Sequence, residues 1–69
     1  MTDQEKLEAI LLHLRQAHAR AATAESRALD ELNSAKGAHE RAERRERYEY
    51  VVGKFMGLGE AIDIVDRII

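Results

Sequence analysis

The three histidines are the side chains best suited to hold a metal ion. His13 and His18 are five residues apart, which places them on different faces of a helix. Metal-binding pairs on a helix stand three or four residues apart instead, because that spacing points both ligands the same way. His39 and Glu43 have this spacing but lack a third ligand nearby. We therefore expect no metal site and no cofactor.

No set of residues has the spacing of a catalytic site. Ser26 and Ser34 have no histidine at a helical offset that would activate a hydroxyl group. The glycines of the C-terminal third are not followed by Lys-Ser/Thr and not preceded by a strand, as a phosphate-binding loop requires. The chain contains no cysteine, which removes thiol nucleophiles and cysteine-ligated zinc. We expect a protein that is not an enzyme.

A run of arginines is the candidate nucleic-acid interface, because arginines on one helix face can neutralise phosphates. Four glutamates alternate with them and cancel much of their field, and the net charge of the whole chain is −2. Nucleic-acid binding is therefore the alternative function, and nucleic acid is not the partner we favour. The arginines concerned are Arg41, Arg44, Arg45 and Arg47.

The amino-acid composition indicates which secondary structure the chain forms. The 69 residues are 35% charged and 4% aromatic, with no proline, and Ala, Glu, Arg and Leu dominate. That composition is typical of long helices and coiled coils. A chain this short buries a small core, so it needs oligomerisation or a partner for stability. It lacks a basic leader and any apolar stretch long enough to cross a bilayer, so we expect a cytoplasmic protein with no membrane contact.

A seven-residue repeat predicts how the first helix associates. Thr2 and Glu5 have the spacing of a capping box, which starts a helix at Asp3. From Leu7 onward, apolar residues recur at the two core positions of a coiled coil, which predicts a homo-oligomer, namely a dimer. The predicted self-association residues are Leu7, Ile10, Leu14, Ala17, Ala21, Ala24, Ala28, Ala35 and Ala42.

Residues 33–37 leave two architectures open, because Asn33, Ser34 and Gly37 are poor helix formers. In the first, one amphipathic helix runs over residues 3–52 as a coiled coil. In the second, Asn33 takes a left-handed conformation, Ser34 caps a new helix, and the chain folds into an antiparallel helical hairpin. The heptad phase crosses this segment unbroken and favours the continuous helix. A turn would set Ala21 and Ala22 opposite Tyr48 and Tyr50, small against large, which favours the hairpin.

The C-terminal third is the most apolar part of the chain. Gly57-Leu58-Gly59 predicts a break, followed by a short helix over residues 60–69. Tyr48, Tyr50, Phe55 and Met56 have the character of binding hot spots, and the alternative is that they form the core under the terminal helix. The predicted partner-binding residues are Tyr48, Tyr50, Phe55, Met56, Ile62, Ile64, Val65, Ile68 and Ile69.

These observations predict a single all-α domain over residues 1–69, with a long amphipathic helix, as a coiled coil or hairpin, and a short C-terminal helix. The predicted function is a non-catalytic protein–protein interaction module that self-associates and acts as an adaptor or inhibitor of a larger partner protein. In composition alone, and at no specific residue, the chain resembles the small accessory proteins of phages and mobile elements.

Overall fold

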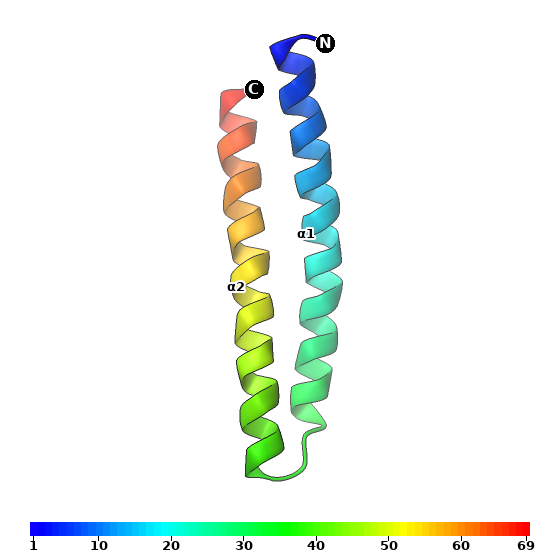
Figure 1. Cartoon of the computed structure of the whole chain (residues 1–69), viewed down its shortest axis with the longest axis vertical. Coiled ribbons are helices and arrows are strands. Elements are labelled where there is room, and N and C mark those ends of the chain that lie inside the picture. Colours follow the sequence, from blue (N-terminus) through cyan, green and yellow to red (C-terminus); the bar gives the residue numbers. More distant parts are fainter.

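The computed structural model describes all 69 residues, which form an antiparallel hairpin of two helices (Figure 1). Helix α1 (Asp3–Asn33) and helix α2 (Ala38–Ile68) lie side by side, and both chain ends meet at one end of the molecule. The Cα trace measures 54 × 15 × 13 Å. The prediction of an all-α fold is confirmed.

The first turn of α1 is held by its own side chains. The Glu5 N–H donates to Thr2 Oγ1 at 3.2 Å, and the Thr2 N–H donates to Glu5 Oε1 at 3.2 Å. These two bonds satisfy backbone donors that a helix start otherwise leaves unpaired. The predicted capping box and the helix start at Asp3 are confirmed.

The chain reverses direction at residues 34–37, so the predicted continuous helix over residues 3–52 is wrong and the hairpin is the fold. The local prediction for the turn is also wrong, because Asn33 is the last residue of α1 and Ser34 is right-handed, with φ −92°. Gly37 instead has a positive φ, +89°, and directly precedes α2. Glycine takes this conformation because it has no Cβ to clash with the backbone.

The core is a single seam between the two helices. Four residues are buried, namely Leu11, Ala21, Ala28 and Ala35. Half-buried side chains continue the seam at alternating spacings of three and four residues, the spacing at which side chains share one helix face. On α1 the seam residues are Leu7, Leu11, Leu14, His18, Ala21, Glu25, Ala28 and Leu32; on α2 they are Arg44, Tyr48, Val51, Phe55, Leu58, Ile62 and Val65.

Helix α2 passes through Gly57-Leu58-Gly59 without interruption, so the predicted break and the separate short helix over residues 60–69 are wrong. A glycine inside a helix costs about 1 kcal/mol relative to alanine. Phe55, Leu58 and Ile62 are half-buried on the seam around these glycines. Their burial against α1 offsets that cost, since each large apolar side chain contributes roughly 1.5–3 kcal/mol when fully buried.

We predict that Gly57→Ala stabilises the protein by about 0.5–1 kcal/mol, because alanine restricts the unfolded chain and favours the helix. A Cβ at Gly57 would meet no atom within 4 Å. Gly37→Ala is the matched control with the opposite sign, and it should destabilise by about 1 kcal/mol because of the positive φ. Urea denaturation followed by circular dichroism measures both, and a stabilising Gly37→Ala would contradict the turn.

Candidate functional site: the two faces of the hairpin

A stacked pair of rings fixes the register of the two helices near mid-length. The His18 imidazole and the Phe55 ring have centroids 4.3 Å apart and planes 21° apart. The imidazole also lies beside Gly59, where an added Cβ would stand 3.6 Å from His18 Nε2, an ordinary van der Waals contact. The histidine thus fills space in the seam beside two residues of α2.

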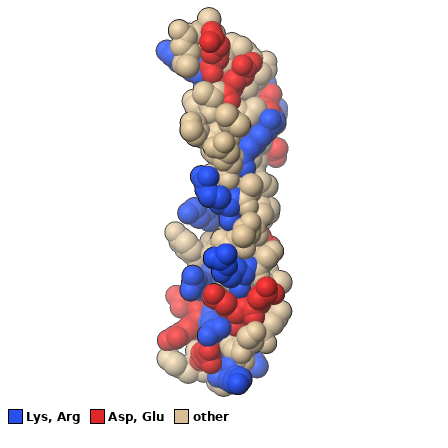
Figure 2. Space-filling view, turned by 90° about the vertical axis from the view of Figure 1, so that its right-hand side faces the viewer, with Lys and Arg blue, Asp and Glu red and all other residues tan.

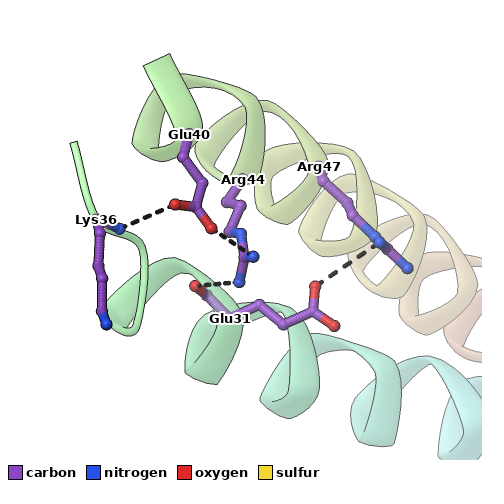
Figure 3. A network of polar contacts seen from close by, with 5 residues as sticks. All are labelled: Glu31, Lys36, Glu40, Arg44 and Arg47. Atoms are coloured by element: carbon purple, nitrogen blue, oxygen red, sulfur yellow. Dashed lines mark hydrogen bonds and ion pairs between the residues drawn. The ribbon is translucent and has the colours of Figure 1, made fainter. Parts of the chain in front are cut away.

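A polar network ties the helices together next to the turn (Figure 3). Arg44 reaches across the seam, donating to the Glu31 carbonyl oxygen at 3.0 Å and pairing with the Glu40 carboxylate at 2.6 Å. Arg47 lies 3.7 Å from the Glu31 carboxylate, and the backbone N–H of Lys36 donates to Glu40 at 3.2 Å. These contacts hold the turn and the first turns of α2 against the end of α1.

The structure separates the four arginines that the sequence grouped as a nucleic-acid interface. Arg44 lies in the seam, and Arg47 lies on one side of it with Glu31. Arg41 and Arg45 are exposed and form no ion pair. Arg45 lies on the other side of the seam, seven residues before Val52, whereas Arg41 lies in line with the seam, seven residues before Tyr48. The run therefore does not present a single basic face.

His39 pairs with Glu43 at 3.0 Å, at the spacing that the sequence indicated, and its side chain is almost fully exposed. No group of three or more His, Asp, Glu or Cys side chains gathers in one place where it could hold a metal ion.

One side of the hairpin carries a shallow groove of about 320 Å³ at mid-length, which we call the Tyr50 face. Tyr50 lines the groove with 72% of its surface exposed. Seven-residue steps along each helix, which keep to one face, extend this face to Ile10 on α1 and to Ile64 and Ile68 on α2. The groove residues are Ala17, Arg20, Ala21, Ala24, Tyr50, Val51 and Lys54.

Basic side chains surround this groove. Arg20 and Lys54 line it, Arg27 lines a smaller hollow beside it, and none of the three forms an ion pair within the chain. Figure 2, which looks onto the α1 side of the hairpin, shows Lys and Arg gathered at mid-length while Asp and Glu lie mostly toward the two ends. The Tyr50 face is thus an apolar groove with a positive rim.

The opposite side, which we call the Met56 face, is crossed by an ion pair at 3.4 Å between Arg15 on α1 and Asp66 on α2. Seven-residue rows run from these two residues along each helix, through Ala22 and Leu29 on α1 and through Val52 and Arg45 on α2. The neighbouring rows add exposed apolar side chains. The apolar members of this face are Leu12, Ala19, Ala22, Leu29, Val52 and Met56.

The predicted self-association residues fall in three places. Leu7, Leu14, Ala21, Ala28 and Ala35 lie in the seam within one chain. The second predicted column lies on the Tyr50 face, as Ile10, Ala17 and Ala24. Ala42 is exposed on α2, two seven-residue steps before Met56, and so lies on the Met56 face.

The predicted partner-binding residues divide between the seam and the surface. Tyr48, Phe55, Ile62 and Val65 are half-buried in the seam. The others are exposed: Tyr50, Ile64 and Ile68 on the Tyr50 face, Met56 on the opposite face, and Ile69 at the chain end. The row of Ala22 and Leu29 was not predicted from the sequence as a binding surface. The signal that could have indicated it is that each residue directly follows an alanine of the seam.

Comparison of the chain with protein-family models, with curated proteins and with solved structures finds no match. Neither helix is long and apolar enough to cross a membrane. The proposed function therefore rests on the shape and charge of the two faces of the hairpin.

We predict that Arg44→Ala lowers the free energy of unfolding by about 1 kcal/mol, because it removes a half-buried hydrogen bond to Glu31 and an ion pair with Glu40. Arg27→Ala is the control, since this arginine is exposed and forms no ion pair, and its effect should stay within about 0.5 kcal/mol. Thermal and urea unfolding provide the measurement. Equal effects of the two substitutions would contradict the role assigned to Arg44.

Proposed function

We propose that this chain is a non-catalytic protein-interaction module of the cytoplasm. It self-associates as a dimer of hairpins, which forms a four-helix bundle, and it acts as an adaptor or inhibitor by occupying a surface of a larger partner protein. The support comes from the surface that the hairpin leaves exposed.

The exposed area is the observation that carries the proposal. The hairpin exposes 5284 Å² to solvent. A compact monomer of 7.8 kDa exposes about 4,400 Å² by the usual scaling of surface with mass. The excess of about 900 Å² is close to the roughly 800 Å² that each partner buries in a standard protein–protein interface. Association therefore supplies the burial that a lone hairpin lacks.

Self-association predicts a mass twice that of the 7.8 kDa chain when the purified protein is measured by light scattering over a range of micromolar concentrations. The melting midpoint should rise with concentration, because a dimer gains stability by mass action. A monomer at every concentration that is fully helical and melts cooperatively would contradict the proposal.

The Tyr50 face supports the second part, binding to a larger partner. Tyr50 is an exposed aromatic side chain beside an alanine-lined groove, and Arg20 and Lys54 stand at the rim without counter-charges. A partner helix with an apolar stripe flanked by acidic residues matches both the groove and the rim, in the manner of helix-in-groove recognition.

To test the partner, the tagged chain is used to capture proteins from extracts of its native cells. A specific partner should be lost from the Tyr50→Ala bait and from the Arg20→Glu/Lys54→Glu bait, because one removes the anchor and the other reverses the rim charge. Gln16→Ala, on the outside of α1, is the matched control that should retain it. Equal capture by all three baits would contradict a role for this face.

Nucleic-acid binding through Arg41, Arg44, Arg45 and Arg47 stays the alternative proposal, with less support. Two of these arginines are engaged with glutamates, and the four do not share a face. The alternative predicts binding that weakens steeply with salt and with alanine at the four positions. No binding even at low salt would rule it out.

A further inference from the structure

We infer that the second copy docks on the Met56 face, antiparallel to the first, with α1 against α1 and α2 against α2. This inference rests on the proposed self-association and names the surface and the arrangement. The Met56 face is complementary to itself under a two-fold axis that lies in the interface and crosses the helices at right angles. The apolar side chains of this face and the charged side chains near its two ends both fit this two-fold axis.

The level of the axis follows from the groove on the other side. That groove is lined by residues 17–24 of α1 and residues 50–54 of α2, so these two segments stand side by side at mid-length. On the Met56 face of α1, Leu12 and Leu29 lie equally far on either side of the midpoint between residues 20 and 21, and so do Ala19 and Ala22. An antiparallel copy therefore sets leucine against leucine and alanine against alanine.

Helix α2 has its own centre of symmetry at residue 54, within the segment that lies beside residues 17–24 of α1. Val52 and Met56 lie equally far on either side of residue 54, so an antiparallel copy sets valine against methionine. Leu12 and Met56 are more than half exposed in the single hairpin, at 56% and 60%. This docking covers both side chains, and the small Ala19 and Ala22 near the axis let the two α1 helices approach closely.

The end charges fit the same axis. Arg45, toward the turn, and Asp63, toward the open end, lie equally far on either side of residue 54. Neither side chain forms an ion pair in the single hairpin. The antiparallel arrangement sets Arg45 of one copy beside Asp63 of the other, and the two-fold axis makes this contact twice. A parallel arrangement would instead set arginine near arginine at the turn end.

The Tyr50 face does not accept a second copy in this way. The same two-fold axis on that side would set Lys54 of one copy against Lys54 of the other, and Arg20 near Arg20 of the other. Neither side chain forms an ion pair within its own chain. Like charges brought together disfavour such docking. The dimer therefore uses the Met56 face and leaves the groove free for the partner proposed above.

A charge-swap series measured by analytical ultracentrifugation tests the arrangement. Arg45→Asp and Asp63→Arg, each alone, turn two attractive contacts into repulsive ones and should weaken the dimer about tenfold. The double variant should recover most of the affinity, because it restores the opposite charges. Lys54→Glu, on the Tyr50 face, is the control and should leave the dimer constant unchanged. Circular dichroism of each variant verifies that the helices are intact.

The outcomes separate this inference from the proposed function. A dimer that ignores both single swaps, or that responds to Lys54→Glu instead, overturns the Met56-face arrangement while self-association stands. A weakening that the double variant does not rescue overturns the antiparallel pairing of residues 45 and 63. A helical, cooperatively folding monomer in the wild type overturns both proposals.

Discussion

Two helices packed side by side have one seam in which to bury apolar side chains, and this geometric limit governs the rest of the molecule. Each helix presents a single stripe to its neighbour, and the other sides of its surface stay in water. Only Leu11, Ala21, Ala28 and Ala35 are buried as a result. Alanine contributes little area, so this seam draws the helices close without supplying much hydrophobic free energy. The large apolar side chains that remain outside the seam follow from the same limit.

Polar groups in the seam specify the fold more than they stabilise it. His18 stacks on Phe55, and Arg44 bonds to the Glu31 carbonyl oxygen across the helices. An alanine-rich seam offers many near-equivalent registers, because small side chains interlock weakly. The stacking of the His18 ring on the Phe55 ring favours the register that brings these two side chains together. The exposed ion pair of Arg15 and Asp66 contributes little free energy, as is usual at a surface.

The parts that the sequence predicted were those set by local chemistry, such as the capping box and the weak helix formers at residues 33–37. The choice between a continuous helix and a hairpin depended on the heptad phase, and alanine made that phase uninformative. Ala42 fits the seven-residue column that starts at Leu7, yet it is exposed. Helix α2 turns a different set of heptad positions toward α1, among them Tyr48, Val51 and Phe55. The second seam column was missed because it contains His18 and Glu25, polar residues whose burial depends on the neighbouring helix.

The separation of charge between the two faces links the fold to the proposed function. The unpaired Arg20 and Lys54 around the groove disfavour a second copy there, whereas on the opposite face α2 carries Arg45 toward the turn and Asp63 toward the open end. A dimer built on the Met56 face presents two identical grooves on opposite sides of a four-helix bundle. Two such grooves would engage a repeated or dimeric partner with an avidity above that of either groove alone. In this arrangement, self-association supplies both the burial that the hairpin lacks and the second binding site.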